Sequence, residues 1–152
     1  MAEIAFEDLP AGTVVDLGTT VVDGDEMVAF ARRFDPQPFH VDPAAGKASV
    51  FGDLAASGWF TAGLWMRAYV DGLLCRSTAL GSPGGDEIAW PAPVLAGDEL
   101  RATMRVLDAR VSRSRPEMGL ITLRGEMTRE RDDAVVYRSR FTGMFGLRTP
   151  AP

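Results

Sequence analysis

Apolar and polar side chains alternate in segments of the last third of the chain. Apolar residues stand at positions 100, 102, 104 and 106 with polar residues between them, and residues 120–124 repeat the alternation. A period of two places successive side chains on opposite faces of a strand. We therefore predict three long strands over residues 100–111, 119–130 and 134–147. Their polar face is typical of antiparallel strands with one side in solvent.

The N-terminal part combines one strand pattern with helical spacing. Residues 13–22 are rich in Val and Thr and predict a strand. Residues 23–25 (DGD) are typical of a helix start, and the apolar spacing that follows predicts a helix. This helix should stop at Asp35, because Pro36 follows it. Residues 42–43 (DP) favour a short helical turn that the aspartate caps.

The longest apolar stretch predicts the central helix. After a loop of small residues at 52–58, Ser57 and Gly58 begin a helix that runs to about residue 74. It is apolar nearly all round, which is typical of a helix enclosed by other structure. Arg67 and Asp71 interrupt the stretch and would be costly in a bilayer, so we expect a core helix and no contact with a membrane.

The segment between this helix and the last strands contains many glycines and prolines. Residues 81–85 (GSPGG) predict a turn, residues 87–90 begin a strand with an irregular end, and residues 95–99 predict another turn. The order of strand, helix, apolar helix and a run of strands is typical of an α+β domain whose sheet wraps one long helix. We expect residues 1–152 to form a single domain.

Charge and composition exclude several classes of function. The formal net charge of −5 argues against non-specific nucleic-acid binding, which depends on neutralising phosphates. The N-terminus lacks a basic segment followed by an apolar run, so no signal peptide is visible and we expect a cytoplasmic protein. With one cysteine and one histidine, the chain can form neither an intrachain disulfide nor a Cys or multi-His metal site. We expect no metal, no cofactor, and Cys75 as a buried structural thiol.

The candidate chemistry is an aspartate five residues before the only histidine. Asp35 and His40 are joined by a segment with two prolines, which restricts how the two side chains can lie. Histidine can take and return a proton near neutral pH, and a nearby carboxylate can fix its tautomer and stabilise its charged form. The alternative is a surface loop that merely ends a helix.

Four segments in order resemble the MaoC-like acyl dehydratases, which include the (R)-specific enoyl-CoA hydratases. They are FDPQPFHVDP at 34–43, FGDLAASG at 51–58, DEIAWPAPV at 86–94 followed by Gly-Asp at 97–98, and SRSRP at 112–116. The first is similar to the family's Asp-x4-His motif, and the likeness spans about residues 5–147. The resemblance implies a hotdog fold, in which a curved antiparallel sheet of about five strands wraps the helix.

The resemblance also implies that two groups of residues carry out two different catalytic tasks. Asp35 and His40 would position one water and return its proton to the substrate's Cα, whereas the backbone N–H of Gly58 would stabilise the thioester oxygen. The start of a helix suits this second task, because its first N–H groups have no internal partner. Ser57 would either cap the helix or touch substrate. Trp59 and Asp53 depart from the family pattern, and Trp59 could narrow the acyl tunnel.

The resemblance implies an acyl-CoA substrate, an enoyl thioester, and a homodimer that pairs sheets edge to edge. Arg113 and Arg115 would meet the CoA phosphates, or else occupy a solvated hairpin. The bulk of Trp59, Phe60 and Trp65 favours a short or medium acyl chain. Two alternatives remain: a hotdog thioesterase, which relies on a carboxylate without this Asp-x4-His turn, and a non-catalytic subunit that binds acyl thioesters.

Overall fold

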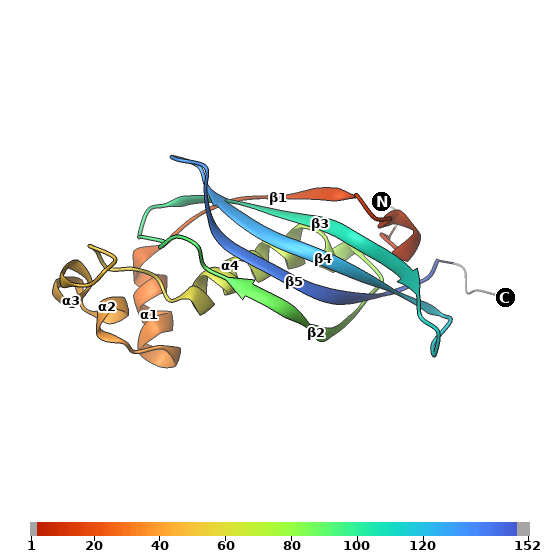
Figure 1. Ribbon diagram of the computed structural model, residues 1–152, viewed down its shortest axis with the longest axis horizontal. Coiled ribbons are helices and arrows are strands. Elements are labelled where there is room, and N and C mark those ends of the chain that lie inside the picture. The colour runs from red at the N-terminus through yellow and green to blue at the C-terminus, as the bar shows by residue number, and fades with distance from the viewer. Residues whose placement is uncertain (1–2, 149–152) are drawn as a thin grey trace.

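The computed structural model describes residues 3–148 as one curved antiparallel sheet that wraps a long helix (Figure 1). The order of the strands across the sheet is β1-β3-β4-β5-β2, and neighbouring strands are antiparallel throughout. The strands are β1 (Val14–Val21), β2 (Ala79–Ala89), β3 (Glu99–Val111), β4 (Met118–Arg129) and β5 (Ala134–Gly146). This is the hotdog arrangement that the family resemblance implied.

Two groups of helices have different places in the fold. The long helix α4 (Gly58–Gly72) lies along the concave face of the sheet, while three shorter helices gather at one end of the molecule (Figure 1). These are α1 (Gly24–Phe34), α2 (Pro38–Val41) and α3 (Pro43–Ala48). Two 3₁₀ turns complete the set, η1 (Phe6–Asp8) and η2 (Leu74–Arg76). The start of α4 points toward the cluster of short helices.

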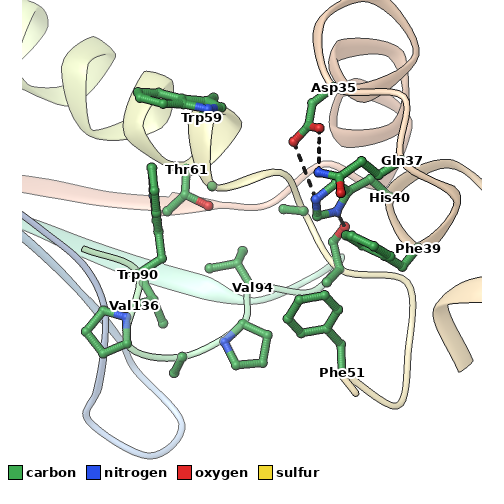
Figure 2. A pocket seen from close by; sticks show the side chains of 16 residues that line it. Asp35, Gln37, Phe39, His40, Phe51, Trp59, Thr61, Trp90, Val94 and Val136 are labelled. Carbon is green, nitrogen blue, oxygen red and sulfur yellow. Dashed lines mark hydrogen bonds and ion pairs between the residues drawn. The ribbon is translucent and has the colours of Figure 1, made fainter. Parts of the chain in front are cut away.

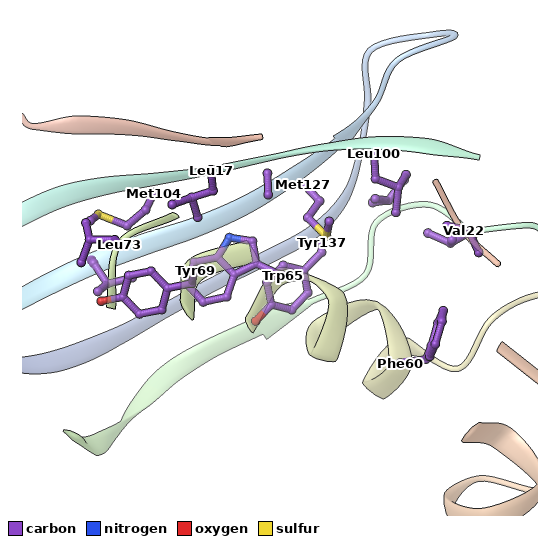
Figure 3. Close-up of a cluster of buried hydrophobic side chains, with 14 of the residues drawn as sticks. Leu17, Val22, Phe60, Trp65, Tyr69, Leu73, Leu100, Met104, Met127 and Tyr137 are labelled. Atoms are coloured by element: carbon purple, nitrogen blue, oxygen red, sulfur yellow. The ribbon is translucent and has the colours of Figure 1, made fainter. Parts of the chain in front are cut away.

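The core fills the space between α4 and the concave face of the sheet (Figure 3). Trp65 is 1% exposed, and its indole N–H donates to the carbonyl of Thr103 at 3.0 Å. The ring lies against Gly125, where a Cβ would come within 2.4 Å of it, so the sheet needs glycine at that point. Trp65 also stacks on Tyr69 and meets Phe141 edge-on. Burial of such aromatic side chains anchors the helix to the sheet.

The predicted strand pattern and helix caps are confirmed. The apolar residues at positions 100, 102, 104 and 106 are all buried on the concave face, with polar residues between them on the other face. The carboxylate of Asp23 accepts hydrogen bonds from two N–H groups of α1, and that of Asp42 accepts one from α3. Helix α1 ends at Phe34, as the following Asp35-Pro36 pair predicted.

The predicted turn at residues 81–85 is wrong. These residues lie inside β2, which runs from Ala79 to Ala89 along the edge of the sheet. Gly81 and Gly84 have φ values of +119° and +130°, and the pairing with β5 shifts register at both places. An edge strand tolerates proline and bulges because one side of its backbone needs no ladder. The Gly-Pro signal therefore marks bulges and not a chain reversal.

Two burial predictions are also wrong for the chain as described. Helix α4 is enclosed on one side only, because Trp59 and Met66 on its outer side are 58% and 45% exposed. Cys75 is exposed in η2, where its thiol donates to the carbonyl of Asp71. The apolar character of a segment predicts that it packs somewhere, but not on how many sides. No helix within residues 3–148 is long and apolar enough to cross a membrane.

Candidate active site

The junction of α1 and α2 places Asp35 and His40. Asp35 caps the C-terminus of α1, and its carbonyl accepts a hydrogen bond from the Gln37 N–H at 2.8 Å. Pro38 then occupies the first turn of α2, where its missing N–H costs nothing. His40 lies in the same short helix and its side chain turns inward, so that the residue is only 6% exposed. The two prolines thus bring the carboxylate and the imidazole together.

The hydrogen bonds of His40 define its tautomer. Nδ1 lies 2.7 Å from the carbonyl oxygen of Ala55, and a carbonyl can only accept, so Nδ1 carries a proton. In the neutral ring Nε2 therefore keeps its lone pair. Nε2 lies 3.5 Å from Oδ2 of Asp35 (Figure 2). The Ala55 peptide is itself held by its N–H, which donates to the carbonyl of Phe39 at 3.3 Å. The ring is thus ready to accept a proton at Nε2.

Two donors hold the carboxylate of Asp35. The Gln37 amide donates to Oδ1 at 2.8 Å, and the Ser57 hydroxyl donates to Oδ2 at 2.7 Å. Partial burial alone would raise the pKa of Asp35. The hydrogen bonds from Gln37 and Ser57, together with the charge of His40, outweigh burial and lower this pKa below its usual value. Asp35 is therefore a carboxylate at neutral pH and can stabilise a charged imidazole.

The start of α4 supplies free N–H groups on the other side of the site. Ser57 is the N-cap, and its hydroxyl accepts a hydrogen bond from the Trp59 N–H at 3.3 Å. Among residues 3–148, no acceptor bonds the N–H of Gly58. The indole of Trp90 lies against Gly58 so closely that a Cβ would come within 2.6 Å of it. Glycine is therefore required here for packing as well as for access to the backbone.

A cavity of about 490 Å³ joins these two halves (Figure 2). Its wall is mainly apolar, and its polar groups come from the α1–α2 connection, from α2 and from the first turn of α4. The lining residues are Asp35, Gln37, Phe39, His40, Phe51, Ala55, Ala56, Gly58, Trp59, Thr61, Trp90, Pro91, Ala92, Pro93, Val94 and Val136. An apolar cleft with a few convergent polar groups is the usual form of a small-molecule site.

The model of the MaoC-like domain matches residues 8–124, which is more than half of the chain. The chain belongs to the MaoC-like domain family. Its fold is similar to that of the MaoC-like dehydratase from Rhodospirillum rubrum, with a TM-score of 0.88 and 37% identity over 96% of this chain and 99% of that one. The Rhodospirillum rubrum protein is described as a dehydratase.

Two further proteins resemble this MaoC-like chain. The R-hydratase PhaJ1 from Pseudomonas aeruginosa shares the fold, with a TM-score of 0.72 and 17% identity over 97% of this chain and 88% of that one. The mesaconyl-CoA hydratase of Haloarcula marismortui is 34% identical over 68 residues, which cover 45% of this chain and 19% of that protein. The first likeness supports the hotdog fold, and the second is confined to part of each chain.

The MaoC-like fold brings together four of the residues proposed from sequence. Asp35, His40, Gly58 and Trp59 all line the cavity. Ser57 is fully buried behind the wall, where it caps α4 and bonds to Asp35, so the capping interpretation describes its place. Of the bulky residues expected to narrow the acyl tunnel, Phe60 and Trp65 instead belong to the core.

The proposed phosphate-binding arginines lie elsewhere. Arg113 and Arg115 are in the β3–β4 connection, at the opposite end of the molecule from α1–α3 (Figure 1). Arg113 lines a separate surface pocket with Arg110 and Ser112. Within one chain, the structure does not place either arginine at the cavity that Asp35 lines.

Sequence reasoning missed three residues of the cavity wall, Gln37, Thr61 and Trp90. Gln37 lies inside the Asp-x4-His segment, so its contact with Asp35 was open to inference. Thr61 stands one turn after Gly58, and this helical spacing was its only signal. Trp90 reaches Gly58 through the fold alone, and no sequence signal connects the two. Within residues 3–148, no group of three His, Cys, Asp or Glu side chains could hold a metal ion.

Proposed function

We propose that the chain adds water to a trans-2-enoyl thioester, or removes water from the corresponding (R)-3-hydroxyacyl thioester. The observation that carries this proposal is the state of His40. Its Nδ1–H is committed to the Ala55 carbonyl, and its free Nε2 faces the Asp35 carboxylate at 3.5 Å. Both groups can accept a hydrogen bond, so one water in the cavity beside the pair could donate to each. Such an arrangement holds a water and removes its proton.

The hydration step balances with these groups alone. His40 Nε2 takes a proton from the water as its oxygen bonds to Cβ of the substrate. The electrons of the double bond move toward Cα, and negative charge builds on the thioester oxygen, where the Gly58 N–H donates a hydrogen bond. The imidazolium then returns the proton to Cα. Asp35 stabilises the imidazolium without being protonated itself, in keeping with its lowered pKa.

The substrate class in this proposal is an acyl-CoA with a short or medium chain. The partial likeness to a mesaconyl-CoA hydratase supports a CoA thioester. Trp59 and Trp90 meet edge-on at the cavity, with ring centroids 5.1 Å apart. Their bulk limits the space for an acyl chain. Trp90→Leu should raise the kcat/KM for long chains relative to short chains by roughly tenfold, which a series of enoyl-CoAs of graded length would measure.

We also infer that two chains pair through an edge of the sheet. Strand β2 is an edge strand, and Leu80 and Ile88 on it are more than a third exposed. A second copy would also be needed for Arg113 or Arg115 to reach a CoA bound in the cavity, so their phosphate contact remains a prediction. A single species with the mass of a monomer, in sedimentation at micromolar concentration, would contradict pairing.

One assay tests the proposed reaction against its alternatives. Loss of the ultraviolet absorbance of a short trans-2-enoyl-CoA, without release of free CoA thiol, is the expected result. Release of thiol from a saturated acyl-CoA would instead indicate a thioesterase. Binding of enoyl-CoA without turnover would indicate a non-catalytic subunit. His40→Ala is the control that separates this activity from a contaminating hydratase.

A further inference from the structure

Thr61 presents an unpaired hydroxyl to the cavity. The residue is 1% exposed, yet it lines the cavity beside Gly58. Within residues 3–148, its hydroxyl has no hydrogen-bond partner. A threonine inside a helix often bonds to the carbonyl four residues earlier. Here that carbonyl, on Ser57, accepts only the Thr61 N–H at 3.2 Å. The hydroxyl oxygen is not one of the fully enclosed polar atoms that lack a partner, so it opens on the cavity, where a ligand can accept its hydrogen bond.

The helix directs this hydroxyl toward the start of α4. Thr61 follows Gly58 by three residues, so the two lie on the same side of the helix. The Cα–Cβ bond of a helical residue tilts toward the helix N-terminus, which brings the Thr61 side chain back over the turn that holds the Gly58 N–H. Figure 2 shows Thr61 directed into the cavity near Trp90, with Asp35 and His40 across from it.

We propose that the Thr61 hydroxyl donates a second hydrogen bond to the thioester oxygen, alongside the N–H of Gly58. This assignment rests on the proposed hydration and extends it by one catalytic residue. Two donors fixed in one helical turn would face the oxygen on which charge develops. Because they are already oriented, they need no rearrangement as the charge appears. The apolar wall around them would strengthen each hydrogen bond.

A packing role for Thr61 predicts different effects of substitution than a hydrogen-bonding role does. If the residue only filled space, valine would replace it without loss, because valine has nearly the same shape and is branched at the same atom. A hydrogen-bonding role requires the hydroxyl and should tolerate serine. Thr61→Val and Thr61→Ser are therefore a matched pair, in which one variant removes the hydroxyl and the other retains it.

The first test is steady-state hydration of a four-carbon trans-2-enoyl-CoA. Thr61→Val should lower kcat by roughly 10²-fold with little change in KM, because the hydrogen bond strengthens as charge builds. Thr61→Ser should keep most of the activity. Thermal unfolding of both variants should match that of the natural chain. Valine activity within about threefold of the natural chain, or equal losses in both variants, would overturn the inference.

The second test does not depend on turnover. The same enoyl-CoA, labelled with ¹³C at the carbonyl, would be bound to His40→Ala, and its carbonyl stretching frequency measured by infrared difference spectroscopy. We expect a frequency lower than in water, which moves back upward when Thr61→Val is added. An unchanged frequency would overturn the Thr61 contact. If the natural chain hydrates nothing but the frequency still moves, the proposed reaction fails and the Thr61 contact stands.

Discussion

The first turn and the middle of α4 belong to one helix but differ in whether their polar groups have hydrogen-bond partners. In the middle, the indole N–H of Trp65 is buried and bonded to the Thr103 carbonyl. In the first turn, the Gly58 N–H and the Thr61 hydroxyl face a cavity and have no partner within residues 3–148. The middle of the helix therefore packs against the sheet, whereas the start of the helix presents unpaired donors to the cavity.

The largest effect should come from the side of the cavity that faces this open turn. His40→Ala removes the proton carrier and Asp35→Ala removes its carboxylate, so each should lower the hydration rate by roughly 10²–10⁴. In the proposed mechanism the two groups act on one water, so the double variant should be little slower than either single variant. Initial rates of enoyl-CoA hydration measure all three.

These variants should keep the fold, since neither residue contributes an apolar side chain to the core. Circular dichroism and sedimentation provide the control. Unfolding of both variants would favour the interpretation of the Asp-x4-His segment as a structural turn.

Trp65→Ala should show the reverse pattern in the middle of the helix. Removing a buried indole should lower the free energy of unfolding by about 3–5 kcal/mol, through lost burial and the cavity left beneath Gly125. Denaturant titration measures this loss. The fraction that remains folded should still hydrate substrate, since Trp65 does not line the cavity. If Trp65→Ala kept its full stability but lost activity, the proposed difference in role between the middle and the start of α4 would be wrong.

Two glycines of α4 sharpen the same comparison. At Gly58 a Cβ would come within 2.6 Å of the Trp90 indole, whereas at Gly63 nothing lies within 4 Å. Gly63→Ala should therefore raise the free energy of unfolding by about 0.5–1 kcal/mol through helix propensity, with unchanged activity. Gly58→Ala should displace Trp90 and lower kcat/KM. Equal behaviour of the two variants in melting and in rate would show that the close approach at Gly58 has no consequence.

Ser57 joins the two halves of the site, and its replacement should have an effect about as small as that of Gly63→Ala. Ser57→Ala removes the N-cap of α4 and one donor to Asp35, so the free energy of unfolding should fall by about 1 kcal/mol. The pKa of Asp35 should rise toward its usual value, because Gln37 then remains as the only side-chain donor to its carboxylate. The ¹³Cγ signal of Asp35 reports this titration. Ser77→Ala, which changes a serine in the segment after α4, should leave it unchanged.

The lowered pKa of Asp35 also sets a direction for stability against pH. Its folded value lies below its unfolded value of about 3.9, so its contribution to the free energy of unfolding is present above that pH. The contribution is lost as the pH falls through the folded value. Ser57→Ala should shrink this acid-dependent loss, which denaturant titrations from about pH 5 downward would measure. An Asp35 titration unchanged by Ser57→Ala would contradict the role of that hydroxyl.

Local patterns predicted much of this fold because local physics determines them. The alternation along residues 100–106 requires a strand with one buried face, and Asp42 before Pro43 allows little but a helix start. The Gly-Pro run at 81–85 misled because the same residues serve turns and bulged edge strands, and only the pairing with β5 distinguishes them. The exposure of Cys75 depends on what packs over η2, which sequence does not report.

In the candidate site, too, local contacts could be predicted from the sequence, whereas contacts between distant segments could not. Asp35, His40 and Gln37 lie within one short segment, so their proximity followed from chain geometry. The contact of Trp90 with Gly58 and the place of Arg113 at the far end depend on how distant strands pack. The open hydroxyl of Thr61 was not predictable either, because a lack of partners is a property of the whole surrounding structure.

The most direct test of the central claim uses the fact that His40 is the only histidine. ¹⁵N NMR of the histidine-labelled chain should show a protonated Nδ1 and a bare Nε2 in the neutral ring. The neutral ring should be the form that hydrates substrate, because a charged ring cannot accept a proton. A neutral ring protonated at Nε2 would contradict the account.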